Sequence, residues 1–475
     1  MGEKCGIFGV FGKGLEAARL VYFGLWSLQH RGQESSGIAS SDGRRIHIHK
    51  GEGLVAHVYN DANLRSLPGH SAIGHNRYST SKGSNPLHSQ PVLKKRGLLA
   101  LAHNGNLPSM RKLEGFLKGV KINTSLLNDS GMMHEALSYY LKRGYDLEDA
   151  VRECFPLFTG VFSLLLMTKD KMVAVRDQFG IRPLCLGQLN GGYVISSETC
   201  ALDTVGATFL REIRPGEMVT LTPNGKTSRQ LRKSNQKLDI FEFVYFARPD
   251  SILLGKRVNE VRRNLGFNLA REHPIKADVV IPVPDSAIPA ALGYAEQSGT
   301  RFDHGLIKNR YIHRTFIRPG RRLREFDVEL KLNPIENVIK GKRVVVIDDS
   351  IVRGTTSKRL VDIIRKAGAK RVHLCVSSPP VRFPDFYGIN TPNQKDLIAA
   401  GMQIKDIPKY VGADSVNYLS YKGMLRSTGL PENVFSTSCF TGVYPADIME
   451  RQTEISYNLA GSQTCDITYA PAITM

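Results

Sequence analysis

Cys5 opens the apolar run CGIFGVF and could act as a nucleophile. A thiol with a pKa of about 8.5 beside an α-amine with a pKa of about 8 can exchange a proton near neutral pH. A cysteine at a processed N-terminus therefore carries a nucleophile and its base in one residue. This chemistry requires that residues 1–4 be removed as a short propeptide. The alternative is an inert, buried free cysteine, the usual state of this residue type.

Two adjacent acids follow a buried apolar run in the second half, where residues 344–357 read VVVIDDSIVRGTTS. Ligands of doubly wound sheets bind at the carboxyl ends of strands. The amides and hydroxyls of a Ser/Gly/Thr loop that opens a helix form an anion pocket there. Asp348 and Asp349 would suit sugar hydroxyls and a Mg²⁺ shared with substrate phosphates. From the residues alone, a solvated turn with a helix N-cap fits about as well.

A dense basic segment spans residues 308–324, KNRYIHRTFIRPGRRLR, and contains no acid. Its positive residues are Lys308, Arg310, Arg314, Arg318, Arg321, Arg322 and Arg324. Such charges repel one another when the segment is empty and are attracted by a pyrophosphate, which predicts a lid ordered by substrate. A solvated basic loop and a nucleic-acid patch are the alternatives. Tyr311 and Phe316 are too few aromatic residues for a platform that stacks bases.

The elements that must position these residues differ between the two halves. The first half is rich in short strand-like runs with glycine turns, such as SAIGHNR (71–77) and VFSLLLMT (161–168), interrupted by helical spacing near residues 16–29 and 132–143. This pattern predicts an α+β layering of sheets and helices. The polar residues 224–237 follow, and we interpret them as a connector or surface loop near a domain boundary.

Continuous apolar runs dominate the second half, at residues 277–284, 342–349 and 370–378. Such runs are typical of parallel strands buried on both faces. The segment between the last two has apolar residues at helical spacing and Gly368 at its expected C-cap. The second half is therefore predicted to be an α/β domain built on a parallel sheet.

Composition limits the function classes. The chain has 475 residues and a net charge of +20, and its apolar and charged contents exclude disorder as the main state. The charge fits a nucleic acid, an anionic membrane or a substrate with several phosphates. No apolar run approaches the ~18 residues of a membrane span, and the start has no signal-peptide core. Seven scattered cysteines without a C-x-x-C pair predict a reducing cytoplasm and no complete cysteine metal site.

Four further motifs accompany Cys5, namely LQHRGQESSGI (28–38), GHNRYST (74–80), AHNGNL (102–107) and NDSG (128–131). Together they resemble the N-terminal-nucleophile glutaminase domain of glutamine amidotransferases. The run VVVIDDSIVRGTTS resembles the phosphoribosyl pyrophosphate (PRPP) motif of type I phosphoribosyltransferases, and IPVPDSAIPAA (281–291) resembles their companion strand and loop. With both sets in one chain, the sequence resembles the glutamine PRPP amidotransferases from Cys5 to about residue 450.

This resemblance implies an α+β glutaminase domain, layered α/β/β/α, over residues 5–236, and an α/β phosphoribosyltransferase domain over 237–450. Residues 1–4 would be the propeptide and 451–475 a C-terminal tail. The implied glutaminase roles are Cys5 as nucleophile, Asn104 and Gly105 as oxyanion donors, Arg77 for the glutamine carboxylate and Asp129 for its ammonium. The released ammonia would attack C1 of PRPP and give 5-phosphoribosylamine, the first committed step of purine synthesis.

The resemblance also implies the PRPP site. Asp348 and Asp349 would hold the ribose and, with Ser286, one Mg²⁺ per subunit. The 5′-phosphate would bind Arg353, Gly354, Thr355, Thr356 and Ser357, and Lys308 and Tyr311 would contact PRPP from the lid. Purine nucleotides are implied as feedback inhibitors, and a homodimer or homotetramer as the assembly. Neither a nucleic acid nor a membrane is needed as a partner.

The sequence departs from the family at several positions. The turn at residues 128–131 differs from the usual one but keeps its acid, Gln178 replaces a usual proline, and Arg321 and Glu329 alter the lid. Some members hold an iron-sulfur cluster on four cysteines, but here the matching positions are Asp239 or Ile240, Asp385, Ser436 and Cys439. One thiol cannot replace four ligands, so we predict no iron-sulfur cluster and a buried, structural Cys439.

Three other functions are alternatives to glutamine-dependent phosphoribosyl transfer. A different glutamine amidotransferase, such as a hexosamine-forming enzyme, would share only the first half, and the acidic pair with its phosphate loop argues against it. A catalytically silent relative that senses PRPP would not need the intact set of Cys5, Arg77, Asn104 and Asp129. A basic nucleic-acid-binding protein would explain the charge alone.

Overall fold

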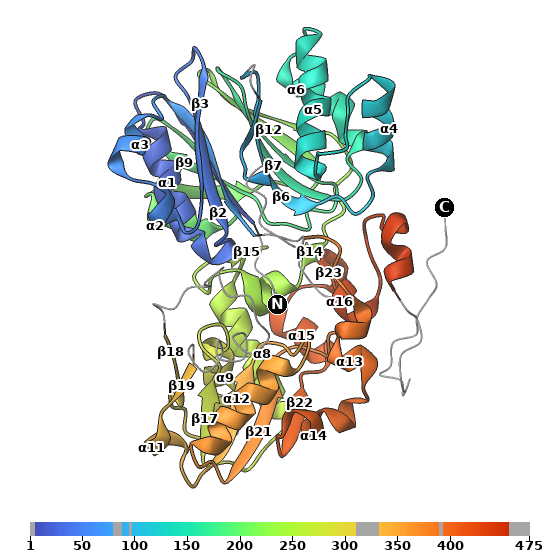
Figure 1. Cartoon of the computed structure of the whole chain (residues 1–475). Helices are drawn as coiled ribbons and strands as arrows, with labels where there is room; N and C mark the ends of the chain where they lie inside the picture. Colours follow the sequence, from blue (N-terminus) through green and yellow to red (C-terminus); the bar gives the residue numbers. More distant parts are fainter. Residues whose placement is uncertain (1–4, 79–87, 95–96, 310–331, 389–392, 456–475) are drawn as a thin grey trace.

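Two antiparallel sheets lie face to face in the first half of the chain (Figure 1). This computed structural model describes residues 5–78, 88–94, 97–309, 332–388 and 393–455. The seven-stranded sheet has the order β11-β9-β10-β1-β4-β2-β3, with strands β1 (Gly6–Gly12), β2 (Ser35–Ser41), β3 (Ile46–Glu52), β4 (Ser71–Arg77), β9 (Cys185–Leu189), β10 (Gly192–Ser196) and β11 (Thr208–Glu212). The six-stranded sheet has the order β13-β12-β8-β7-β6-β5, with strands β5 (Val92–Leu93), β6 (Ala100–Asn106), β7 (Val161–Met167), β8 (Met172–Arg176), β12 (Glu217–Thr222) and β13 (Gly225–Gln230).

Helices cover the outer face of each sheet. Helices α1 (Ala17–Ser27) and α7 (Thr199–Thr204) pack on the seven-stranded sheet, and α4 (Arg111–Gly119), α5 (Asp129–Lys142) and α6 (Leu147–Cys154) pack beside the six-stranded sheet (Figure 1). Residues such as Ile7, Ile73 and Leu165 form the core between the two sheets. This arrangement confirms the predicted α/β/β/α layering.

Strand β1 shows why its sequence is apolar throughout. Phe8 and Val10 pack under α1, whereas Ile7 and Phe11 face the second sheet, so both faces of the strand are buried. Alternation with polar residues is lost when a strand has no solvated face. Gly24 lets α1 approach closely, because a Cβ there would lie 2.4 Å from the Phe8 ring.

The second half contains the predicted parallel sheet, in the order β17-β20-β21-β22. Its strands are β17 (Val279–Pro282), β20 (Arg343–Asp348), β21 (Arg371–Val376) and β22 (Ser415–Tyr418). One face packs on α8 (Val258–Glu272), α9 (Ile288–Ser298) and α15 (Tyr421–Thr428), the other on α12 (Thr355–Lys366) and α14 (Ile407–Val411). Val344 and Val346 face the second set, whereas Val345 and Ile347 face the first, which explains the unbroken apolar run of β20.

The remaining α-helices are short: α2 (Val55–Val58), α3 (Asp61–Arg65), α11 (Glu336–Ile339), α13 (Ile398–Gly401) and α16 (Ser438–Thr441). The remaining strands form three pairs: β15 (Ile252–Leu253) with β16 (Lys256–Arg257), β18 (Leu306–Lys308) with β19 (Leu332–Pro334), and β14 (Leu238–Asp239) with β23 (Phe435–Ser436). The last pair is parallel and joins the start of the second half to its end. Within the described residues, no helix is long and apolar enough to cross a membrane.

One prediction for a connecting segment was wrong. Residues 225–230, interpreted as connector or surface loop, form β13, an edge strand paired with β12. Its residues are polar because most are exposed at the end of the sheet, so no apolar pattern marks the strand. The predicted helix at 132–143 also begins earlier, at Asp129, because the Asn128 side chain accepts a hydrogen bond from the Gly131 N–H at 2.9 Å.

Candidate active sites

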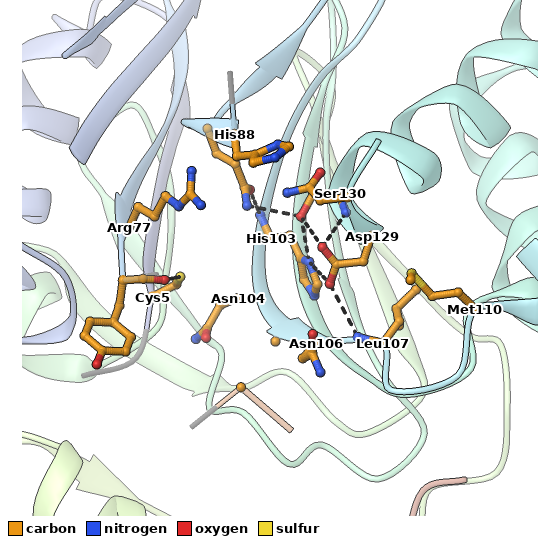
Figure 2. Close-up of a pocket in the computed structure, with 15 residues that line it drawn as sticks. Cys5, Arg77, His88, His103, Asn104, Asn106, Leu107, Met110, Asp129 and Ser130 are labelled. Carbon is orange, nitrogen blue, oxygen red and sulfur yellow. Dashed lines mark hydrogen bonds and ion pairs between the residues drawn. The ribbon is translucent and has the colours of Figure 1, made fainter. Parts of the chain in front are cut away.

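A pocket of about 240 Å³ lies where β1 and α5 begin and β4 and β6 end. It gathers all five predicted glutaminase residues: Cys5, Arg77, Asn104, Gly105 and Asp129. Figure 2 shows Cys5 and Arg77 on one side of the pocket and Asp129 on the other, with Asn104 between them. Residues that are distant in the sequence therefore share one cavity.

Strand pairing explains this convergence. Gly6 of β1 pairs with Asn76 of β4, so Cys5 and Arg77 sit together at adjacent strand ends. Asn104 and Gly105 come from β6 of the facing sheet. The Ser197 hydroxyl joins the two sheets, because it accepts hydrogen bonds from the Ile7 N–H at 3.0 Å and from Asn104 Nδ2 at 3.5 Å. Ser197 was missed, since no sequence pattern indicates this contact.

The Cys5 thiol is held in a hydrogen bond to the Tyr78 carbonyl, with an Sγ to O distance of 3.7 Å. Burial raises the pKa of the Cys5 thiol to about 11, although the Tyr78 hydrogen bond and the charge of Arg77 act in the opposite direction. The thiol is therefore protonated at neutral pH and needs a base before it can attack.

Arg31 holds the backbone of Cys5 in place. Its Nε donates to the Cys5 carbonyl at 3.3 Å, and its other nitrogens bind the carboxylates of Glu198 and Glu242. All three charged side chains are at most 1% exposed. Arg31 lies within the LQHRGQESSGI motif but was given no role, and its partner Glu242 lies 211 residues away. The ion pair connects the cysteine to the second half of the chain.

Asp129 faces Cys5 across the pocket (Figure 2). Its Oδ1 accepts the Ser130 N–H at 2.7 Å, and its Oδ2 lies 3.7 Å from His103 Nδ1. The His103 ring also contacts Ser130 Oγ at 3.0 Å. A cationic Arg77 and an anionic Asp129 thus occupy opposite sides of one cavity, an arrangement that matches the two charged groups of an α-amino acid.

The acidic pair lies at the carboxyl end of β20, as predicted. Asp348 ends the strand, and the Ser286 hydroxyl donates to Asp349 Oδ2 at 2.6 Å. Burial, together with the nearby charge of Asp349, raises the pKa of Asp348 to about 8. Two carboxylates and a hydroxyl thus meet at one strand end, the oxygen donor set that Mg²⁺ uses when it shares a substrate's phosphates.

The loop that follows opens α12 with Gly354 as its N-cap. Gly354 has φ +75°, and a Cβ there would lie 2.5 Å from Ile398 Cδ1. Thr355, Thr356 and Ser357 form the first turn, where N–H groups without helical acceptors can bind an anion. Lys308 is exposed and pairs with Asp285 at 3.1 Å. Tyr311 and the remaining lid positions lie outside the described residues.

Comparison with known proteins gives the same assignment for both halves. Residues 75–204 match the glutamine amidotransferase domain family, and residues 252–379 match the phosphoribosyl transferase domain family. The chain is 43% identical to the amidophosphoribosyltransferase of Bacillus subtilis (strain 168), over 95% of this chain and 96% of that one. It is 46% identical to the enzyme of the same name from Synechococcus elongatus, over 94% and 92% of the two chains.

The chain belongs to the amidophosphoribosyltransferases. A solved structure described as the allosteric regulatory enzyme of purine biosynthesis superposes with a TM-score of 0.87 at 42% identity, covering 94% of this chain and 97% of that one. The B. subtilis glutamine PRPP amidotransferase in complex with ADP and GMP gives 0.86 at 42% identity, covering 94% and 98%. This amidophosphoribosyltransferase is a glutamine-dependent phosphoribosyltransferase of the first step of purine biosynthesis.

Asp239, Asp385, Ser436 and Cys439, which we predicted from the sequence to occupy the positions of cluster cysteines, lie close together. Asp239 and Ser436 are paired in β14 and β23, and Cys439 Sγ lies 3.9 Å from Asp385 Oδ2. The buried Arg182 guanidinium pairs with Asp239 at 2.9 Å and lies 3.9 Å from Asp385. Cys439 is 2% exposed, as predicted, and burial raises the pKa of its thiol well above the usual value.

Substitution of Gly354 by alanine tests the phosphate loop. A methyl group at φ +75° would strain the backbone and crowd the side chains of Ile398 and Tyr410 beside the loop. We therefore expect PRPP to bind at least about tenfold more weakly. Gly412→Ala is the control, because Gly412 has φ +78° but its Cβ would find no atom closer than 3.9 Å. Titration calorimetry with PRPP and Mg²⁺ measures both. Equal weakening in the two variants would contradict a specific role for Gly354.

Proposed function

We propose that this enzyme hydrolyses glutamine at Cys5 and transfers the ammonia to C1 of PRPP bound beside Asp348 and Asp349. The products would be 5-phosphoribosylamine, glutamate and pyrophosphate. The observation that carries the proposal is the single pocket that holds Cys5, Arg77, Asn104, Gly105 and Asp129 in a chain that also has the acidic strand end and phosphate loop.

The glutaminase roles follow from charge and position. Arg77 would bind the α-carboxylate of glutamine and Asp129 its α-ammonium, which places the side-chain amide toward Cys5. Attack by the sulfur converts the amide carbonyl oxygen into an oxyanion. The Asn104 amide and the Gly105 N–H would donate to that oxygen.

The base for this attack would be the α-amine of Cys5 itself, after loss of residues 1–4. While those residues are attached, the Cys5 nitrogen is a peptide amide, which neither accepts a proton nor carries charge. A free ammonium beside the sulfur would also favour the thiolate, against the burial that raises the thiol pKa. Accordingly, we assign residues 1–4 as propeptide, 5–236 as glutaminase, 237–450 as phosphoribosyltransferase and 451–475 as tail.

On the phosphoribosyltransferase side, the ribose hydroxyls would bind Asp348 and Asp349. The oxygen groups of Ser286, Asp348 and Asp349 fit one Mg²⁺, which would supply charge neutralisation for the leaving pyrophosphate. The 5′-phosphate would lie on Gly354 to Ser357, with Arg353 adjacent. Lys308 would move from Asp285 to the pyrophosphate, since an exposed ion pair contributes little stability.

We propose further that this member holds no iron-sulfur cluster. Iron-sulfur clusters of this kind need four thiolates, and the matching positions offer the single thiol of Cys439. Arg182 balances the charges of Asp239 and Asp385 instead, so the site has its own buried ion pairs.

Regulation and assembly are proposed from the relatives. The B. subtilis structure is described as a complex with ADP and GMP, and we infer purine nucleotide feedback on this enzyme too. A homodimer or homotetramer is the expected assembly. The hexosamine-forming alternative is wrong, because the relatives match over both halves. A silent PRPP-sensing relative is disfavoured by the complete pocket.

Replacement of the nucleophile separates the two half-reactions. Cys5→Ser is expected to lower glutamine-dependent synthesis at least about 10²-fold, and Asn104→Ala to lower kcat for glutamine hydrolysis about 10²- to 10³-fold. Synthesis from PRPP and free ammonia should continue in both variants. Assays of glutamate and pyrophosphate release measure this split. Full glutamine-dependent activity in Cys5→Ser would contradict the role of Cys5 as the nucleophile.

Metal analysis tests the cluster assignment. Protein purified without oxygen is expected to contain no stoichiometric iron or acid-labile sulfide and to lack absorbance near ~400 nm. Elemental analysis and a visible spectrum measure this directly. Iron at about four atoms per chain with matching absorbance would overturn the assignment.

A further inference from the structure

One wall of the glutaminase pocket comes from the second half of the chain. Gly388 lines the cavity, whereas the other lining residues among those that the structure describes lie between positions 5 and 130. Gly388 follows β21 and belongs to the segment 385–388, which reads DFYG. The glutaminase pocket is therefore not built by the glutaminase domain alone.

Hydrogen bonds hold this segment against the pocket. Asn106 Nδ2, at the end of β6, donates to the Phe386 carbonyl at 2.7 Å. Arg182 Nε donates to the Tyr387 carbonyl at 3.1 Å, and Arg182 is fully buried. The Tyr387 N–H binds Asp385 Oδ1 at 2.7 Å, and its hydroxyl donates to the Ala446 carbonyl at 2.7 Å. The Phe386 carbonyl and both the N–H and the carbonyl of Tyr387 are thus fixed in place.

The approach to β6 leaves little room for a side chain at Gly388. Gly388 has φ +109°, and a Cβ there would lie 3.3 Å from the Gly105 oxygen and 3.4 Å from its carbonyl carbon. It would also lie 3.5 Å from Arg182 Nη2. The contact with the Gly105 oxygen would be tighter than an ordinary van der Waals contact, and φ +109° strains any residue except glycine. Glycine meets both requirements.

We propose that residues 386–388 position the oxyanion strand, and that Gly388 is a positioning residue for glutamine hydrolysis. The segment contacts the Gly105 carbonyl and binds the next residue, Asn106, so that the Gly105 N–H keeps its direction as the oxyanion forms. This inference rests on the proposed oxyanion role of Gly105. If the inference holds, glutamine hydrolysis depends on the phosphoribosyltransferase domain, because residues 386–388 of that domain form one wall of the glutaminase pocket.

Substitution of Gly388 by alanine tests the wall in the full-length, processed enzyme. The added methyl group strains the backbone at φ +109° and presses on the Gly105 carbonyl, which must shift by a few tenths of an ångström. We therefore expect kcat for glutamine hydrolysis to fall about tenfold or more, while KM for glutamine changes by less than about threefold. Synthesis from PRPP and free ammonia should be unchanged. Gly225→Ala is the control, because Gly225 has φ +119° but no atom within 4 Å of its Cβ. It should match the parent enzyme in all three measurements.

Several outcomes would overturn the inference. An unchanged kcat in Gly388→Ala would do so, as would a parallel loss of glutamine-dependent and ammonia-dependent synthesis, which indicates general damage. If Gly388→Ala does not fold, Asn106→Ala decides, because it removes the hydrogen bond to Phe386. A normal kcat for glutamine hydrolysis in Asn106→Ala would then refute the inference.

The test also separates the inference from the proposed function. If Asn104→Ala loses glutamine hydrolysis while Gly388→Ala keeps it, only the wall is refuted. If Asn104→Ala keeps full glutamine hydrolysis, the oxyanion site itself is wrong and the wall fails with it. Parallel loss of kcat in Asn104→Ala and Gly388→Ala, with ammonia-dependent synthesis intact, supports both.

Discussion

The buried thiol of Cys5 is the constraint on which the proposed glutaminase chemistry depends, because it would have to become a thiolate. Burial raises the pKa of Cys5 to about 11, so the pocket disfavours the charged form that attacks glutamine. The imidazole of His103 is engaged with Ser130 and lies near Asp129, across the pocket from Cys5. We therefore propose that Cys5 itself carries the base. Its α-amine would meet that need once residues 1–4 are gone.

The rest of the molecule fixes what surrounds that thiol. Adjacent ends of β1 and β4 place Arg77 beside Cys5, and the facing sheet brings the oxyanion strand. Arg31 ties the Cys5 carbonyl to Glu242 in the second half. Residues 386–388 close the pocket from the same half. The glutaminase pocket thus lies at the boundary between the two halves of the chain, and residues of both halves hold it together.

Local sequence patterns predicted much of this architecture. Strands β4 and β7 lie at the predicted positions, and the apolar run of β7 is a local signal of a buried strand. The motif residues also converge as predicted. By contrast, the contacts of Glu242, Ser197 and Phe386 join residues about 90 to 280 positions apart, and neither periodicity nor composition encodes such pairs. Strand β13 was missed because an exposed edge strand needs no apolar face.

The mass of the N-terminus of active enzyme tests the central claim most directly. If the α-amine of Cys5 is the base, every molecule with full glutamine-dependent activity must begin at Cys5, with Met1 to Lys4 absent. Intact-protein mass spectrometry of the purified, assayed enzyme shows this in one measurement. A homogeneous product that begins at Met1 or Gly2 and has full activity with glutamine would contradict the account.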